Sequence, residues 1–311
     1  MDATTDTRYA AQTAVEPSAG SPVVVLDNAL DRVSALDFKI PNPFVNHAPM
    51  AVEALAALGQ QSVISDWVAH YETAMGRAVS PVTPNWARGF DWKDLLGDYR
   101  LLPEWMGYFR QAIDGEGWRE VIALWVPRLM PGLVAALFHG VIRTSHAVRA
   151  IEVADTDARR AELARALGNW ATWFAPGQPI DAAYVRFADP QESAVHAAAH
   201  GARCYAAAPT IFNLHGVTGA MAVHLLAAHL SPSDAQMAVV QLHAEHRSLY
   251  QDVNPPSDRN EETWDDRTVA KASESYDAHQ IKLVEACRRG FALTGEPGFS
   301  QAAKLVTSST S

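Results

Sequence analysis

The chain has 311 residues, of which 48% are hydrophobic and 19% are charged, and its formal net charge is −10. This balance is typical of a globular protein and excludes a disordered or fibrous one. An acidic chain without a basic run has no surface for nucleic acid or for anionic lipid, so neither partner is expected. Its two cysteines, Cys204 and Cys287, exclude a disulfide framework and a cysteine zinc site, and they fit a reducing, cytoplasmic compartment.

The N-terminal residues 1–22 are predicted to form a flexible tail, because they are polar and lack the basic and apolar regions of a secretory signal. The next stretch, SPVVVLD at 21–27, is the clearest β-like run. Helical periodicity dominates the rest. Helices are expected at 49–59, 61–75, 117–153, 156–173, 189–207, 215–230, 232–250 and 262–290. Because neither a repeat nor a linker interrupts them, residues 23–305 are predicted to form one all-α, bundle-like domain.

Two segments between or within these helices have distinctive compositions. Residues 80–105 are rich in Pro, Gly and Trp, which indicates an ordered loop with short helical turns. The apolar stretch 121–138 contains Pro127, Arg128 and Pro131, so it is interpreted as a buried core helix rather than a membrane span.

The last predicted helix has the most regular apolar stripe, with His279 inside it and Lys282 one turn further on. Arg288, Arg289 and Gly290 are expected to end this helix, as cations and a terminal glycine do. The stripe consists of Val269, Ala272, Tyr276, His279, Leu283 and Ala286.

Most of the twelve histidines are expected to be ordinary surface or hydrogen-bonded core residues. His196 and His200 have zinc-like H-x3-H spacing, but no acidic residue stands between them, so a metal role is disfavoured. His243 and His246 are assigned to a solvated helix face, and His70, His224 and His229 are interpreted as structural.

Four histidines in apolar surroundings are candidates for a metal site: His47, His139, His215 and His279. Each lies on a different predicted element, and together they could converge inside a bundle, as ligands do in bundle-core metal sites. The stretch FHGVIRTSHAVRA adds Arg143 and His146 to the helix face of His139. Such polar groups in an apolar segment need partners. No dinucleotide-binding glycine motif, P-loop, E-x-x-H pair or G-x-S-x-G elbow is present.

Four segments resemble the questin oxidase-like family, and they occur in the same order along the chain as in the family. They are NHAPMAVEALAALG at 46–59, LMPGLVAALFHGVIRTSHAVRA at 129–150, FNLHGVTGA at 212–220 and DAHQIKLVEACRRG at 277–290. The family is associated with the oxygenation of aromatic polyketides, including Baeyer–Villiger-type opening of anthraquinone rings in secondary metabolism. Its members look like all-α, non-haem iron enzymes with a histidine-rich site.

The resemblance implies an oxidoreductase, a metal-dependent oxygenase, in which His47, His139, His215 and His279 bind the metal. Lys282 would join them only deprotonated or as a carboxylated lysine, since a protonated amine has no lone pair; a plain ion pair with Glu285 or Asp277 is the alternative. Arg143 stands where the family tends to carry a second histidine. The catalytic candidates are Arg143, which could hold a substrate oxygen, orient a ligand or pair with an acid, and His146, which could replace that histidine. Without such a replacement the site would have one ligand fewer.

Imidazole and oxygen ligands suit Fe(II), and also Zn, Mn or Ni; iron is preferred because the resemblance implies O2 as co-substrate. The expected substrate is a small aromatic molecule in an apolar pocket walled by Trp86, Trp92, Tyr99 and Trp105. Two rival functions stay open: a Zn-dependent hydrolase or lyase at the same histidines, and a non-catalytic binder of aromatic ligands. The need for NADPH and the formation of a homo-oligomer also stay open.

Overall fold

The computed structural model describes residues 20–38, 45–77, 79–85, 91–180, 186–255 and 263–308. Most of the predicted tail at 1–22, as well as Trp86, lies outside this part. The N-terminal half contains α1 Pro22–Ser34, β1 Leu36–Phe38, α2 Ala48–Ala57, α3 Ile64–Ala74, β2 Met75–Arg77, α4 Leu102–Glu116, α5 Trp118–Leu129 and α6 His139–Val153. The C-terminal half contains α7 Asp157–Thr172, α8 Pro190–Ala207, α9 Ile211–Ala227, α10 Pro232–Leu249, α11 Arg267–Glu274, α12 Ala278–Thr294 and α13 Pro297–Ser308. Short 3₁₀ helices occupy Gln61–Val63, Trp92–Leu95, Tyr99–Leu101 and Met130–Gly132.

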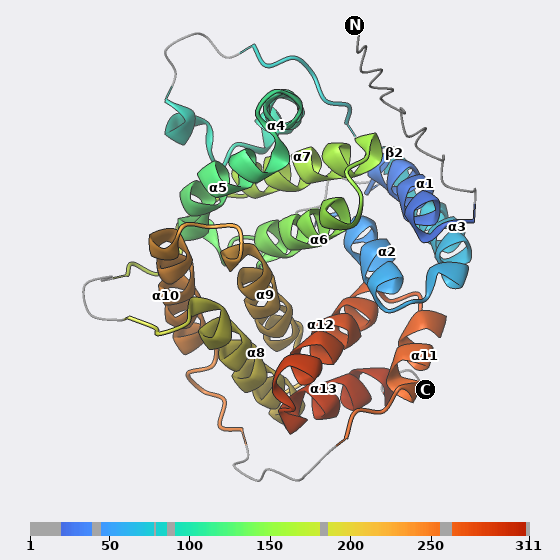
Figure 1. The fold of residues 1–311 in the computed structure, drawn as a ribbon, viewed down its shortest axis with the longest axis vertical. Helices are drawn as coiled ribbons and strands as arrows, with labels where there is room; N and C mark the ends of the chain where they lie inside the picture. The colour runs from blue at the N-terminus through green and yellow to red at the C-terminus, as the bar shows by residue number, and fades with distance from the viewer. Residues whose placement is uncertain are drawn as a thin grey trace, which may run out of the picture.

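The predicted all-α class is confirmed, because the described residues form thirteen α-helices and one two-stranded antiparallel ribbon of β1 and β2. Helix α6 lies near the centre, with α7, α2 and α9 around it and α12 below (Figure 1). One large apolar core is shared by the helices from α4 to α10 with α12 and α13, and a smaller one lies among α1, α2 and α3.

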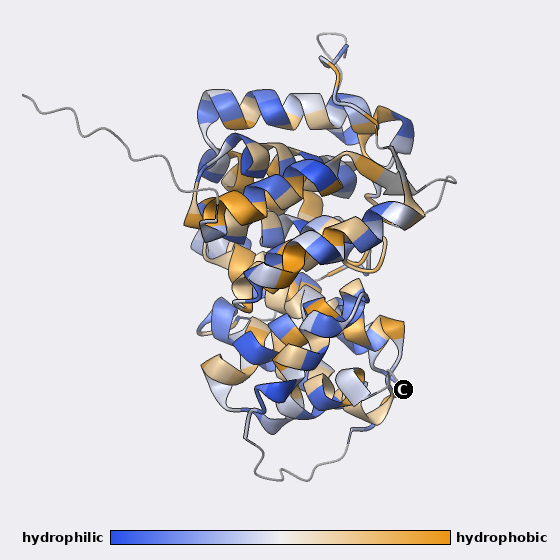
Figure 2. Ribbon diagram, turned by 90° about the vertical axis from the view of Figure 1, so that its right-hand side faces the viewer, coloured by the Kyte–Doolittle hydropathy of each residue, from blue (hydrophilic) through white to orange (hydrophobic). Residues whose placement is uncertain are grey.

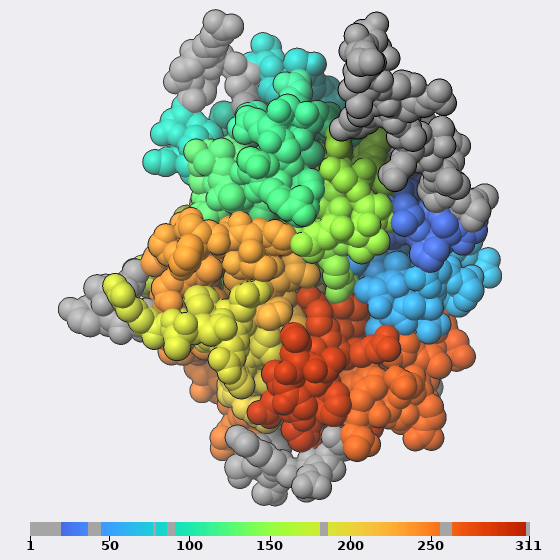
Figure 3. Space-filling view, in the orientation of Figure 1, coloured from blue at the N-terminus to red at the C-terminus, as the bar shows by residue number. Residues whose placement is uncertain are grey.

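Hydrophilic and hydrophobic residues alternate along the helices, as expected for elements with one buried side (Figure 2). None of the described helices has the length and apolar character needed to cross a membrane. In the space-filling view the C-terminal helices pack between α8 and the N-terminal α2, so α12 from the end of the chain lies beside α2 from its beginning (Figure 3).

The expectation of a strand at 21–27 was wrong, because this segment is the first part of α1. The Ser21 side chain accepts a hydrogen bond from the Val24 amide, and Pro22 occupies the first turn, as in many helix starts. The buried residues Leu26, Ala29, Leu30 and Val33 follow helical spacing, and their packing overrides the β preference of three consecutive valines. The small β component instead pairs Leu36–Phe38 with Met75–Arg77.

The single helix predicted at 117–153 is two helices, and the interruption matters for the site. Helix α5 ends at Leu129, Pro131 follows in a 3₁₀ turn, and Ala136, Leu137 and Phe138 all adopt left-handed backbone angles before α6 begins. A proline removes a helical hydrogen bond, which explains the break. His139 is therefore the first residue of α6 rather than a mid-helix residue.

The C-terminal prediction also needs correction. The segment 262–290 contains α11 and α12, which are separated at 275–277, and α12 continues to Thr294, where Gly295 ends it with a positive φ of 68°. Tyr276, placed in the buried stripe by its spacing, is 53% exposed in this break. In addition, α4 begins inside the predicted Trp-rich loop, and α13 was not predicted.

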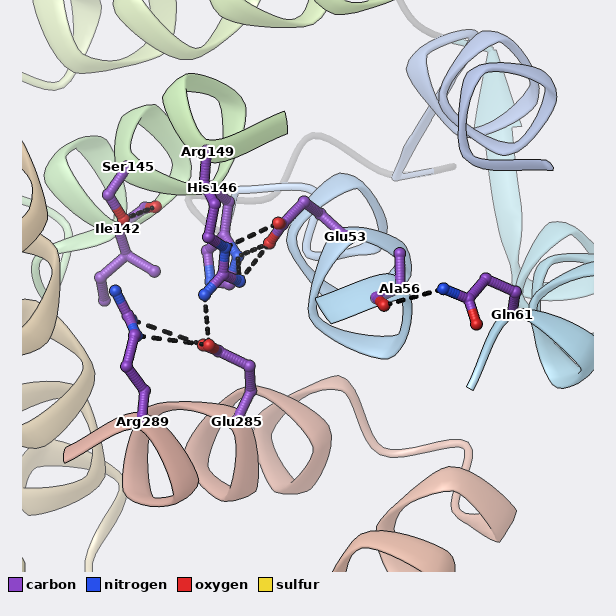
Figure 4. A network of polar contacts seen from close by, with 9 residues as sticks. All are labelled: Glu53, Ala56, Gln61, Ile142, Ser145, His146, Arg149, Glu285 and Arg289. Carbon is purple, nitrogen blue, oxygen red and sulfur yellow. Dashed lines mark hydrogen bonds and ion pairs between the residues drawn. The ribbon is translucent and has the colours of Figure 1, made fainter. Parts of the chain in front are cut away.

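A buried ionic network links α2, α6 and α12 (Figure 4). Arg149 of α6 bonds to Glu53 of α2 and to Glu285 of α12, and Glu285 also pairs with Arg289. Although burial alone raises the pKa of Glu53, the charge of Arg149 and hydrogen bonds from His146 and Arg149 lower it to about 2. Glu53 and Glu285 are 5% and 4% exposed, so Arg149 compensates two carboxylates that water does not reach.

We therefore expect Arg149→Leu to lower the free energy of unfolding by about 3–5 kcal/mol, the typical cost of leaving a buried charge without its partner. Urea unfolding followed by circular dichroism measures this loss. The matched control is Arg32→Leu, which breaks a half-exposed Arg–Glu pair between α1 and α3 and should cost at most about 1 kcal/mol. Equal losses in the two variants would contradict the importance of the network.

Candidate metal centre

Four helices form a closed ring around the candidate centre, in the order α2, α6, α9 and α12, and each contacts the next (Figure 1). Each carries one histidine near its N-terminal end: His47 precedes α2, His139 and His279 lie in the first turns of α6 and α12, and His215 lies in the second turn of α9. One ligand atom from each lies within 4.8 Å of those of the other three. The predicted convergence of these four histidines is thus observed.

His47 is held at the start of α2 by its neighbour Asn46. The Asn46 amide donates to the carbonyl oxygens of Val33 and Leu36, and its side-chain oxygen accepts from the Ala48 amide. One buried asparagine therefore fixes the chain immediately before His47 to α1 and to the β-ribbon. The motif NHAP contains this residue, but its role depends on contacts with α1 that local spacing does not reveal.

His139 is placed by tight packing on both of its neighbours. A Cβ on Gly140 would lie 2.4 Å from Trp170, and a Cβ on Gly219 would lie 2.7 Å from Phe138. A side chain at either position would collide with an aromatic ring, so both positions require glycine. The left-handed turn at 136–138 costs roughly 1–2 kcal/mol per residue, so it persists only because this packing determines it.

Two of the four imidazoles are oriented by a hydrogen bond at Nδ1, and a third lies beside a carboxylate. His139 donates to the carbonyl of Ala136, His215 donates to the carbonyl of Ile211 at 2.7 Å, and the Nδ1 of His279 lies 3.4 Å from Asp277. The two hydrogen bonds fix the tautomers of His139 and His215 and leave their Nε2 atoms facing the centre, as a hydrogen bond to the outer nitrogen does for metal-binding histidines.

The facing nitrogens lie close together. Nε2 of His139 is 2.7 Å from Nε2 of His47 and 3.1 Å from Nε2 of His215. Since carbonyl oxygens hold the Nδ1 protons of His139 and His215, their Nε2 atoms carry lone pairs when neutral. The 3.1 Å contact between these two then joins two acceptors without a proton, which is unfavourable unless a cation lies between them.

Protonation does not resolve this conflict. Burial, followed by the nearby Lys282 charge, lowers the pKa of His139 to about 3 and lowers the pKa values of His47 and His215 well below their ordinary range. The imidazoles are therefore neutral at neutral pH, which is the form that binds metals. Ligands at about 2.0–2.1 Å from a common ion lie roughly 3–4 Å apart. The 3.1 Å between Nε2 of His139 and Nε2 of His215 fits this spacing, whereas the 2.7 Å between Nε2 of His139 and Nε2 of His47 is shorter. The four histidines could hold a metal ion.

Lys282 is fully buried one turn beyond His279, and its amine has no hydrogen-bond partner among the described residues. Burial lowers its pKa to about 7, so a substantial fraction is uncharged near neutral pH. The alternative ion pair with Glu285 is not observed, because that carboxylate is paired with Arg149 and Arg289.

An apolar pocket of 600 Å³ opens in front of the four histidines. Aromatic side chains of Tyr71, Phe212 and Tyr276 line it, together with Leu137, Ile211 and Asp277. The expected tryptophan wall was wrong for the residues described. Trp92 and Trp105 pack against Trp125 in the core, and Tyr99 packs against Trp173. Composition alone does not separate a core cluster of tryptophans from a cavity wall.

The two catalytic candidates have partners outside this pocket. Arg143 makes a buried bidentate ion pair with Glu162 of α7, at 2.6 and 2.9 Å. His146 lies 2.5 Å from Glu53 in the ionic network. Arg143 and His146 are thus both paired with acids, and neither lines the pocket.

The remaining histidines do not join the centre. Among the described residues, the four-histidine cluster is the one group of three or more histidine, cysteine or acidic side chains arranged to hold an ion. His196 is exposed beside Glu192, whereas His246 is buried, which corrects the expectation of a solvated face for His246.

The Questin oxidase-like family model matches residues 44–154, which confirms the resemblance over this segment. The match includes two of the four histidines, His47 and His139; the fold brings His215 and His279 to them from beyond it. No curated protein shows significant sequence similarity to the chain.

His139→Ala should remove most of the bound metal, because one of four converging ligands is lost. Metal content per chain, measured by elemental analysis after purification, tests this expectation. His196→Ala is the matched control on an exposed helix face and should retain full metal content. Loss of metal in the control, with retention in His139→Ala, would disprove the assignment.

Proposed function

From the match of residues 44–154 to the Questin oxidase-like family, we propose that this protein is a non-haem, metal-dependent oxygenase of an aromatic polyketide, of the anthraquinone class. The observation that carries the proposal is the convergence of four neutral imidazoles at the base of an apolar, aromatic pocket. Opening or Baeyer–Villiger-type oxidation of a ring is the reaction that the family association favours.

His47, His139, His215 and His279 would hold the ion, and we propose Fe(II) as the occupant. Imidazole ligands also suit Zn, Mn and Ni, so the preference for iron rests on the oxygen chemistry of the family. When bound, Fe(II) would supply the activation of O2, and the protein supplies binding, orientation and exclusion of water.

Lys282 completes the proposed ligand set, as a neutral amine or as a carbamate. Its amine is buried without a hydrogen-bond partner among the described residues, which is costly for a core residue and is relieved by coordination. A carbamate would add an oxygen ligand and a negative charge to four neutral imidazoles, which would favour a divalent ion.

The pocket residues suit an aromatic substrate. Tyr71, Phe212 and Tyr276 offer ring faces and edges, and a volume of 600 Å³ is within the usual range for small-molecule sites. The four helix N-termini around the centre carry partial positive charge, which favours a phenolate or enolate oxygen near the histidines.

Asp277 has a positioning role in this proposal. Its side chain caps α12 by accepting from the His279 amide at 2.8 Å, and it also lies beside the His279 ring. Arg143 and His146 contribute through helix α6, since their ion pairs with Glu162 and Glu53 fix the helix that presents His139.

We predict that Lys282→Met lowers metal content and O2-dependent activity without lowering the free energy of unfolding of the metal-free protein. Methionine keeps an apolar stem of similar length and removes an unpaired buried amine, so the metal-free fold should be as stable or more stable. Metal analysis and urea unfolding of the same samples separate the two effects. If Lys282→Met retains full metal content, Lys282 is a core residue and not a ligand.

The function itself is tested with metal-free protein reloaded with Fe(II) or Zn(II) and supplied with a hydroxyanthraquinone. We expect O2 uptake with the iron-loaded protein and not with the zinc-loaded protein. An oxygen electrode measures the uptake, in one series with NADPH and in another without it. Product formation with zinc and without O2 uptake would favour the hydrolase or lyase instead. Tight binding of the aromatic compound without metal or turnover would favour a binding protein.

A further inference from the structure

The outer part of the metal pocket is lined by exposed apolar side chains. The imidazoles of His139 and His215 are buried at its inner end, whereas Ile211, Phe212 and Tyr276 line the same pocket and are 42%, 54% and 53% exposed. These three are among only ten large hydrophobic side chains that are exposed in the described part of the chain. Single exposed apolar residues are common on protein surfaces, but a group of them around one cavity marks a place where something binds.

Phe212 and Tyr276 have the same position relative to a histidine of the centre. The stretches FNLH and YDAH both place an aromatic residue three positions before the histidine, which is His215 in the first and His279 in the second. Within α9 this spacing puts Phe212 on the helix face of His215, roughly 4.5 Å along the axis toward the N-terminal end. Tyr276 comes just before the Asp277 cap of α12. Two neighbouring helices thus each present an imidazole and, further out, a more exposed ring.

Helix α3 holds Tyr276 in place. The Tyr276 ring stacks on His70 of α3, with the ring centroids 3.8 Å apart and an interplanar angle of 25°. The next residue of α3, Tyr71, also lines the pocket, and its ring stacks on Trp67 at 5.1 Å and 16°. Rings that are already stacked lose little side-chain freedom when a ligand packs against them, which favours binding. The two tyrosines therefore form a wall that is ordered before a ligand enters.

The lining of the pocket favours apolar contacts at its outer end. Neither Arg nor Lys occurs among the described residues that line it, and Asp277 is the one acidic residue there. Ring packing and burial of apolar surface, rather than an ion pair with an anionic substituent, would thus hold a ligand. A single ring at the imidazoles would leave Phe212 and Tyr276 in water. A fused-ring ligand that extends outward would cover them, and the additional apolar burial favours the larger ligand.

We propose that Ile211, Phe212 and Tyr276 form an outer subsite, which makes the pocket specific for a polycyclic aromatic substrate rather than a single-ring one. One ring of the substrate lies at the histidines, and the remote ring packs against Phe212 and Tyr276. The subsite depends on the proposed function in one respect, that the substrate occupies the metal pocket. It acts on substrate binding and not on the oxidation step.

Equilibrium dialysis under nitrogen tests the subsite without O2-dependent turnover. The full-length protein, with the metal that it carries after purification, is dialysed against 1-hydroxyanthraquinone and against 2-hydroxyacetophenone, which has the same hydroxyl and carbonyl pair on one ring. Phe212→Ala and Tyr276→Ala should each raise the Kd of the anthraquinone about tenfold, because a ring contact is lost, and should change the Kd of the single-ring compound less than twofold. Tyr276→Phe keeps the ring and should bind both compounds as the wild-type protein does.

The matched control is Leu293→Ala, which removes an equally exposed apolar side chain of α12 that does not line the pocket, and it should leave both Kd values within twofold of wild type. Unchanged affinity for the anthraquinone in Phe212→Ala and Tyr276→Ala, or an equal loss of affinity for both compounds, would overturn the subsite. So would a wild-type protein that does not bind the anthraquinone. If the ring-dependent binding is found but the iron-loaded protein takes up no O2, the proposed oxygenase is wrong and the subsite stands.

Discussion

The geometry of the centre depends on one buried guanidinium, that of Arg149, which is shared by carboxylates from two other helices. It holds α2 and α12 against α6, and these three helices carry His47, His139 and His279. Burying ions stabilises a fold little compared with well-packed apolar groups. We therefore interpret the network as a device that fixes the relative positions of these helices.

The fourth histidine is fixed by packing rather than by charge. Helix α9 meets the start of α6 where Phe138 lies against Gly219, and this contact sets His215 beside His139. Phe138 adopts a left-handed backbone angle there, as do the two residues before it. Ion pairs among α2, α6 and α12, together with a close aromatic contact between α6 and α9, thus bring the four imidazoles to one point.

Burial lowers the pKa values of the four central histidines and of His200, His243 and His246 between α8 and α10, but the two groups differ in what they can bind. At the centre, backbone carbonyls hold the outer protons of His139 and His215, so that their lone pairs face each other and favour a cation. Between α8 and α10 the ring nitrogens of His200, His243 and His246 have separate partners. Imidazoles arranged in this way do not share an ion.

The sequence by itself determined the all-α class and the four apolar histidines, because helical periodicity and local apolar context are properties of neighbouring residues. It did not determine α1, whose valines suggested a strand, nor the left-handed break before His139. Only the tertiary structure decided which acids Arg143, His146 and Arg149 meet and which aromatic residues line the pocket. The physical reason is separation along the chain: periodicity shows which face of a helix is buried, whereas the face that it meets belongs to residues up to 136 positions away.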